Sequence, residues 1–233
     1  MPLLLLPGFM LDETLWTDMA PALAPLGPLA YGDISLDTTI PAIARRILAN
    51  APSTFTLIGF SLGSYVAREV ARQAPDRVTA LILIASALTP DTSEQSRQKE
   101  SAISQMANLP FKGLSQSAIA SSLHINLAHN DALISRIRTM NIRLGKDVFM
   151  RQARLLRNTD SHELARIHCP TLVIAAADDR LRSVAESREL ASGIPHATLH
   201  IMPGVGHMIP LEAPAELAKV ITTWLQKAPV QAP

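Results

Sequence analysis

Short apolar runs and amphipathic runs alternate along the first third of the chain. The apolar runs are continuous, which is typical of strands that are buried on both faces of a parallel sheet. These predicted strands cover residues Leu3–Leu6, Leu29–Tyr31, 54–58 and 78–85. Apolar residues at helical spacing predict helices between them, at residues 11–26, 39–50 and 65–74. The alternation of strands and helices predicts an α/β fold with a mostly parallel sheet.

The pattern changes after residue 87. Residues 88–166 carry no strong strand signal, and predict several short helices with breaks at 108–110, 112–113 and 144–145. The first of these helices is expected to start within Asp91-Thr92-Ser93-Glu94. The alternation then resumes with strands at 171–175 and Thr198–Met202, helices at 185–192 and 215–227, and a tail at 228–233 that we expect to fray. We therefore expect an α/β core at residues 1–87 and 167–233, interrupted by a helical cap at residues 88–166.

Composition narrows the class of protein. The chain has 233 residues, of which 48% are hydrophobic, enough for one large domain or one core with an insertion. A net charge of +1 and the lack of any polybasic run predict that the partner is neither nucleic acid nor a membrane surface. The single cysteine, Cys169, is expected to be a buried structural thiol. The first apolar run is too short for a signal peptide, so a cytoplasmic enzyme is expected.

The segment Gly59-Phe60-Ser61-Leu62-Gly63 is a G-x-S-x-G pattern between a predicted strand and a predicted helix. A serine on such a turn is held in a strained conformation with its hydroxyl exposed, and the glycines let neighbouring elements approach closely. The same pattern also fits a β–α turn with an idle serine. Other residues must therefore decide whether Ser61 is a nucleophile.

A serine nucleophile needs a histidine base, and that histidine needs a carboxylate to hold its tautomer. Asp179 follows the predicted strand 171–175, and His207 follows the strand Thr198–Met202 in a glycine-containing loop. The other histidines lie in the predicted cap or beside strands without such a loop: His124, His129, His162, His168, His196 and His200. Ser61, Asp179 and His207 are therefore the candidate catalytic residues.

An oxyanion hole requires two backbone N–H groups that point at the developing negative charge. One would come from Leu62, directly after the nucleophile. The other would come from the turn Pro7-Gly8-Phe9-Met10 after the first strand. We expect Phe9 to be this donor, with Met10 as the alternative, although Pro-Gly is also a common turn.

Together, three segments resemble the α/β-hydrolase-fold family over nearly the whole chain. Gly59–Gly63 resembles its nucleophile elbow, Pro170–Ile174 with Asp178-Asp179-Arg180-Leu181 its acid turn, and Gly206–Pro214 its C-terminal histidine segment. The resemblance implies a mostly parallel sheet flanked by helices, with an inserted helical cap. It assigns the acid to Asp179, because the family's acid precedes a pair like Arg180-Leu181, and leaves Asp178 as the alternative.

Two segments depart from the family pattern. Pro7-Gly8 stands where the family commonly has His-Gly, which removes a side chain but keeps the backbone donors. Ala175-Ala176-Ala177 stands where the family often has a glycine. The family pattern therefore does not fix the conformation of this loop, which decides whether Asp178 or Asp179 faces the histidine.

The predicted cap is rich in positive charge. Residues 136–157 hold seven basic residues and one acidic residue, a net charge of +6, which a solvated helix face explains first. Alternatively, one or two of these arginines point inward and hold an acidic group of a substrate, with Arg138 and Arg143 as the candidates for the pocket rim. Four apolar residues adjoin the catalytic positions and are expected to line the pocket, although core packing explains them equally well: Phe9, Met10, Phe60 and Met208.

These features predict a carboxylic ester hydrolase that cleaves a small ester or lactone through an acyl-enzyme on Ser61. No metal or organic cofactor is expected, because no cluster of His, Cys and carboxylate has metal-ligand spacing. One alternative is a lyase or acyltransferase of the same fold, acting on an acid-bearing substrate held by cap arginines. The other is a non-catalytic protein that binds a small molecule.

Overall fold

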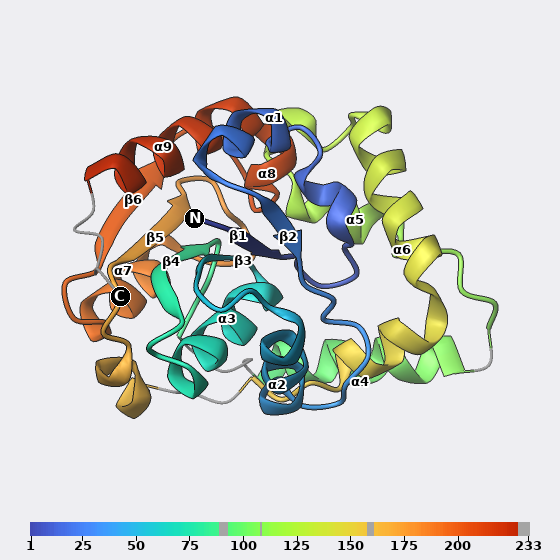
Figure 1. The fold of residues 1–233 in the computed structure, drawn as a ribbon. Helices are drawn as coiled ribbons and strands as arrows, with labels where there is room; N and C mark the ends of the chain where they lie inside the picture. Colours follow the sequence, from blue (N-terminus) through green and yellow to red (C-terminus); the bar gives the residue numbers. More distant parts are fainter. Residues whose placement is uncertain (89–92, 108, 158–160, 228–233) are drawn as a thin grey trace.

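The computed structural model describes residues 1–88, 93–107, 109–157 and 161–227. Its centre is a parallel sheet of six strands in the order β2-β1-β3-β4-β5-β6 (Figure 1). The strands are β1 (Leu3–Leu6), β2 (Leu29–Tyr31), β3 (Phe55–Phe60), β4 (Val78–Ile84), β5 (Thr171–Ala176) and β6 (Thr198–Met202). Every neighbouring pair is parallel, so all the strands end at the same edge of the sheet. Each strand lies where the apolar runs predict it, within two residues at either end.

Helices cover both faces of the sheet because successive side chains of each strand point to opposite faces. Leu4, Leu57 and Val173 face helices α2 (Ile40–Asn50), α3 (Leu62–Gln73) and α7 (Val184–Gly193). Leu5, Ile58 and Ile174 face the side covered by α1 (Ala20–Leu23) and α9 (Pro214–Lys227) (Figure 1). The two clusters of buried side chains form the core that fixes the sheet's carboxyl edge.

The predicted helix at 11–26 is wrong as a single element. The structure has three short pieces there: the 3-10 helix η1 (Glu13–Trp16), α1, and the 3-10 helix η2 (Ala24–Leu26). Prolines lie in the first turns of α1 and η2, where their missing N–H groups cannot continue a preceding helix. The Asp12 side chain caps η1 by accepting a hydrogen bond from the Thr14 N–H, and the side chains of Leu15, Trp16, Met19 and Leu23 are buried.

The chain between β4 and β5 forms α4 (Ser93–Ala107), α5 (Gln116–Ser122), the 3-10 helices η3 (Ile125–Leu127) and η4 (Ser161–Arg166), and α6 (Asp131–Ala153). The described residues of this stretch contain no strand, as predicted. The predicted break at Leu144-Gly145 is a kink inside α6, where Gly145 has a φ of 78°. Asp91, Thr92, Asn108 and the tail at 228–233 lie outside the described residues.

Two further observations concern the cysteine and the described helices. Burial raises the pKa of the Cys169 thiol to about 11, which fits an unreactive structural cysteine. Among the described helices, none is long and apolar enough to cross a membrane.

Candidate active site

Ser61 lies on the tight turn between β3 and α3. Its φ of 49° and ψ of −112° fall in a region that residues other than glycine rarely occupy. The turn can form because Gly59 and Gly63 carry no side chains. A Cβ on Gly59 would lie 2.6 Å from the Gly63 carbonyl oxygen, and a Cβ on Gly63 would lie 2.4 Å from the Pro7 carbonyl oxygen. Ser61 therefore stands at the carboxyl edge of the sheet, on the strained turn that the sequence predicts.

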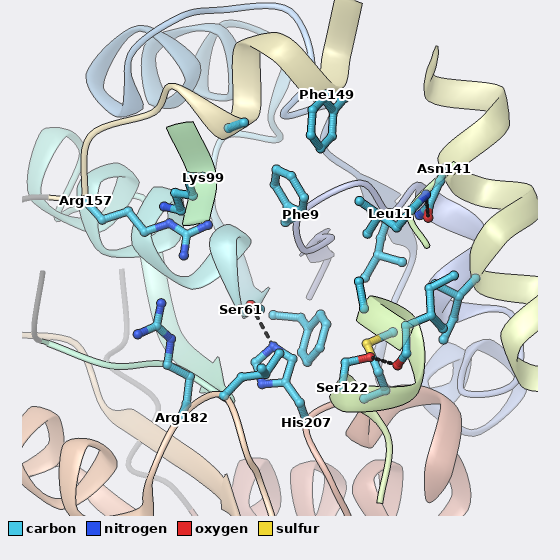
Figure 2. Close-up of a pocket in the computed structure, with 18 residues that line it drawn as sticks. Phe9, Leu11, Ser61, Lys99, Ser122, Asn141, Phe149, Arg157, Arg182 and His207 are labelled. Atoms are coloured by element: carbon cyan, nitrogen blue, oxygen red, sulfur yellow. Dashed lines mark hydrogen bonds between the residues drawn. The ribbon is translucent and has the colours of Figure 1, made fainter. Parts of the chain in front are cut away.

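His207 lies between Ser61 and Asp179. Its Nε2 atom is 3.0 Å from the Ser61 Oγ atom (Figure 2), and its Nδ1 atom is 2.7 Å from the Asp179 Oδ2 atom. The side chains of His207 and Asp179 are only 7% and 1% exposed. When Nδ1 carries the proton and donates to the carboxylate, Nε2 is left to accept the serine proton. The structure thus brings together all three residues predicted as catalytic.

Asp178 and Asp179 have different surroundings. The Asp179 Oδ1 atom accepts hydrogen bonds from the backbone N–H groups of Leu181, at 2.7 Å, and Arg182, at 2.9 Å. These bonds turn the other carboxylate oxygen towards His207. The Asp178 side chain is 49% exposed and accepts a hydrogen bond from the Gly204 N–H at 3.1 Å. Asp179 therefore holds the position facing His207, and the alternative assignment to Asp178 does not fit.

The backbone N–H groups of Phe9 and Leu62, the proposed oxyanion donors, differ in their hydrogen bonding from that of Met10, the alternative donor. Within the part of the chain that the structure describes, no hydrogen bond engages the backbone N–H of Phe9 or of Leu62. Leu62 is the first residue of α3, where helix N–H groups have no partner within the helix. By contrast, the Met10 N–H donates to the Gln152 side chain at 2.8 Å, so it is already engaged. Phe9 and Leu62 therefore remain the predicted donors, and the alternative donor Met10 does not fit.

A cavity of about 360 Å³ opens beside Ser61 and His207, and most of its lining is apolar. Phe9, Phe60 and Met208 line it as predicted. Helices α5 and α6 supply further walls through Ile119, Ile137 and Phe149. The segment between β4 and β5 thus covers the carboxyl edge of the sheet at Ser61.

Three residues that the sequence predicted for the pocket do not line the cavity. Met10 is fully buried away from the cavity, and neither Arg138 nor Arg143 lines it. The Arg143 guanidinium instead pairs with the Asp12 carboxylate, with nitrogen–oxygen distances of 2.9 and 2.7 Å. Arg143 therefore joins α6 to the loop after β1. Three other basic residues line the cavity: Lys99, Arg182 and Arg157, the last of which belongs to the basic run at 136–157.

Sequence reasoning missed two buried amides on α6. Asn141 donates a hydrogen bond to the Met10 carbonyl oxygen at 2.7 Å, and Gln152 accepts one from the Met10 N–H. Both side chains are almost fully buried. Together they fix the loop that carries Phe9 against the cap helix. The only signal in the sequence was two amides placed among the apolar positions of a helix.

Comparison with known proteins agrees with this geometry. Residues 38–214, most of the chain, match the model of the family described as serine aminopeptidase, S33. The chain belongs to this α/β-hydrolase family.

Individual relatives support the same assignment. The RutD protein of Klebsiella pneumoniae, named as a putative carbamate hydrolase, is 30% identical over 190 residues, covering 78% of this chain and 69% of the relative. A pimeloyl-[acyl-carrier protein] methyl ester esterase of the same species is 36% identical over 96 residues, covering 36% of each chain. A malate-bound esterase from Thermogutta terrifontis superposes with a TM-score of 0.83 and 25% identity, covering 97% and 90% of the two chains. The predicted fold and family are thereby confirmed, and the protein is an α/β-hydrolase enzyme.

Glu212, whose role was not predicted from the sequence, fixes the loop that carries His207 in this hydrolase. Its carboxylate accepts hydrogen bonds from the backbone N–H groups on both sides of His207, those of Gly206 at 2.8 Å and Met208 at 3.0 Å. It also accepts one from the His124 N–H at 3.1 Å, which belongs to the predicted cap. Glu212 therefore ties the cap to the loop that carries the imidazole.

We expect Glu212→Gln to lower kcat for ester hydrolysis about tenfold, with a smaller change in KM. Glutamine is uncharged and its amide nitrogen cannot accept a hydrogen bond, so at least one of these N–H groups loses its acceptor, a loss of about 1.5–3 kcal/mol. Steady-state kinetics should show the fall in kcat, because a displaced imidazole affects proton transfer more than binding. The exposed Glu216 is the matched control, and Glu216→Gln should leave kcat unchanged. Equal kinetics in the two variants would contradict the positioning role.

Proposed function

We propose that the protein is a serine hydrolase that cleaves a small carboxylic ester or lactone through an acyl-enzyme on Ser61. The observation that carries the proposal is the continuous hydrogen-bonded chain from the Ser61 hydroxyl through His207 to the Asp179 carboxylate. A binding protein has no need for this arrangement on a strained turn. The ester and methyl ester hydrolases among the relatives agree with this class of reaction.

Acylation begins when the Ser61 Oγ atom attacks the carbonyl carbon of the ester and its proton moves to the His207 Nε2 atom. Asp179 accepts the hydrogen bond from Nδ1 and stabilises the imidazolium that forms. The backbone N–H groups of Phe9 and Leu62 donate to the oxyanion. Collapse of the tetrahedral intermediate breaks the bond to the alcohol oxygen, which takes the proton from Nε2.

Deacylation repeats these steps with water as the nucleophile. Water gives a proton to the His207 Nε2 atom as its oxygen attacks the acyl carbon. The second intermediate collapses, the Ser61 Oγ atom recovers the proton, and the carboxylic acid leaves. In a lactone the alcohol stays attached to the acyl group, so a single hydroxy acid is released.

The cavity favours an ester over a peptide with a free amino terminus. An aminopeptidase must bind an ammonium group, for which a carboxylate is the natural partner. Among the described residues that line the cavity there is no aspartate or glutamate, whereas Lys99, Arg157 and Arg182 are present. The volume of about 360 Å³ lies at the lower end of the range for small-molecule sites, which favours a small substrate.

A fluorophosphonate probe combined with an ester assay tests this proposal. We expect the probe to attach to Ser61 in peptide mass mapping, and the labelled protein to lose hydrolysis of p-nitrophenyl butyrate. Ser122 provides an internal control, because it also lines the cavity but its hydroxyl donates to the Ile119 carbonyl oxygen at 2.7 Å.

Attachment of the probe to Ser122 instead of Ser61 would contradict the proposal. Absence of both labelling and turnover would favour the non-catalytic binding protein. Labelling of Ser61 together with elimination products from an acid-bearing substrate would favour the lyase alternative.

A further inference from the structure

One wall of the cavity beside Ser61 is cationic. Lys99 from α4, Arg157 after α6 and Arg182 after β5 come from three distant segments and line the same cavity. Figure 2 shows these three side chains on one side of Ser61 and His207, with the guanidinium groups of Arg157 and Arg182 pointing towards one another. Phe9 and Leu11 lie on the other side in the same view. The cavity is therefore divided into a basic end and an apolar end, with the nucleophile between them.

Arg182 is held in place next to the catalytic acid. Its backbone N–H donates to the Asp179 Oδ1 atom, and its side chain is only 8% exposed. The Nη1 atom is 3.6 Å from the Glu186 Oε1 atom, so one carboxylate offsets part of this charge. The Glu186 carboxylate also accepts a hydrogen bond from the Ser183 N–H in the capping box of α7. It therefore interacts with both the start of this helix and the Arg182 guanidinium. The loop that supplies the acid thus also supplies a fixed positive charge to the cavity.

Arg157 is placed by an aromatic ring. Its guanidinium carbon lies 5.7 Å from the centroid of the Tyr65 ring, and the Arg68 guanidinium carbon lies 4.5 Å from the same centroid. Cations within about 6 Å of an aromatic face are attracted to it. Tyr65 lies on α3, one turn after Ser61, so this ring places the Arg157 charge at the nucleophile's end of the helix.

We propose that Arg157 and Arg182, with Lys99, bind a free carboxylate of the substrate, so that the enzyme acts on small esters that carry a carboxylate at one end. The inference rests on the proposed esterase function. A planar guanidinium pair matches a carboxylate through charge-assisted hydrogen bonds, and burial against apolar walls strengthens that interaction. The apolar end of the cavity then receives an uncharged part of the substrate. The carboxylate fixes the direction in which the ester lies across Ser61.

The test compares two methyl esters of similar length, monomethyl glutarate and the uncharged methyl pentanoate. Binding of each is measured by calorimetry to the Ser61→Ala variant, which cannot form an acyl-enzyme, and hydrolysis is measured with the unmodified enzyme. We expect the charged ester to bind about 10- to 100-fold more tightly, the range given by charge-assisted hydrogen bonds. We expect a similar preference in kcat/KM.

Replacing the arginines should remove this preference. In the Ser61→Ala background, Arg157→Met should reduce the preference about tenfold or more, and Arg157→Lys should retain part of it. Arg182→Met should act in the same direction, with thermal unfolding used to verify that the variant is folded. Arg138→Met is the matched control, because Arg138 lies on α6 outside the cavity lining, and it should keep the full preference.

The possible failures are distinguishable. Equal binding of the two esters, or a preference that survives Arg157→Met and Arg182→Met in folded proteins, would overturn the carboxylate site. A charged ester that binds selectively but is never hydrolysed would support the carboxylate site and contradict the esterase function instead.

Discussion

Replacing Ser61 by alanine is expected to lower kcat for ester hydrolysis by about 10⁴- to 10⁶-fold, the loss found when a serine nucleophile is removed from a triad. The Oγ atom is the only atom of the proposed catalytic residues that forms a covalent bond to the substrate. Without it, the oxyanion donors and binding groups can assist only a direct attack by water. Steady-state kinetics with p-nitrophenyl butyrate and with a methyl ester provide the measurement.

The strain at Ser61 supplies a matched control for this experiment. Alanine keeps the Cβ, so Ser61→Ala must adopt the same φ of 49° and should unfold at nearly the same temperature. Ser61→Gly also removes the hydroxyl but relieves the strain, which is worth about 1–3 kcal/mol. We therefore expect Ser61→Gly to be equally inactive and to unfold at a higher temperature. Activity of Ser61→Ala within about tenfold of the unmodified enzyme would refute the nucleophile assignment.

The catalytic residues were predictable because each depends on local sequence next to a strand. Ser61 and Asp179 follow strands that are continuous apolar runs, His207 follows the more polar strand Thr198–Met202, and parallel strands end at one edge. Three residues far apart in sequence therefore had to meet there. The same reasoning could not locate the ends of short elements such as the pieces between residues 11 and 26, where prolines override an apolar pattern of helical spacing.

The basic residues of the cavity were not predictable in this way. Arg143 is diverted by Asp12, a partner 131 residues away, and no pattern within α6 reveals that contact. Arg157 reaches the cavity because of how the predicted cap packs over the sheet, and Arg182 reaches it because its backbone is fixed on the loop that carries Asp179. Long arginine side chains can turn towards solvent, a carboxylate or a cavity with little difference in local preference. Charge runs in sequence therefore indicate a basic segment, but tertiary packing decides which of its members face the substrate.

The neighbouring aspartates provide the second large expected effect. We expect Asp179→Asn to lower kcat about 10⁴-fold, as the same substitution does in serine proteases, and Asp178→Asn to change it by no more than a few-fold. An asparagine at either position keeps an oxygen that can accept the neighbouring backbone N–H groups, so both loops should remain folded. The changed group faces His207 in Asp179→Asn, whereas in Asp178→Asn it faces the Gly204 N–H.

The size of the Asp179→Asn effect follows from the histidine tautomer. In this variant the amide oxygen is expected to stay on the N–H groups of Leu181 and Arg182, so the amide NH₂ group faces the imidazole Nδ1 atom. The imidazole Nδ1 atom must then accept a hydrogen bond from the amide, so the imidazole proton lies on Nε2. A protonated Nε2 atom points its N–H at the Ser61 hydroxyl and cannot accept the serine proton. Imidazole NMR of the variant should show the proton on Nε2, and the unmodified enzyme should show it on Nδ1. Equal losses of activity in the two variants, with the same tautomer in both, would mean that the carboxylate facing His207 is not what orients it.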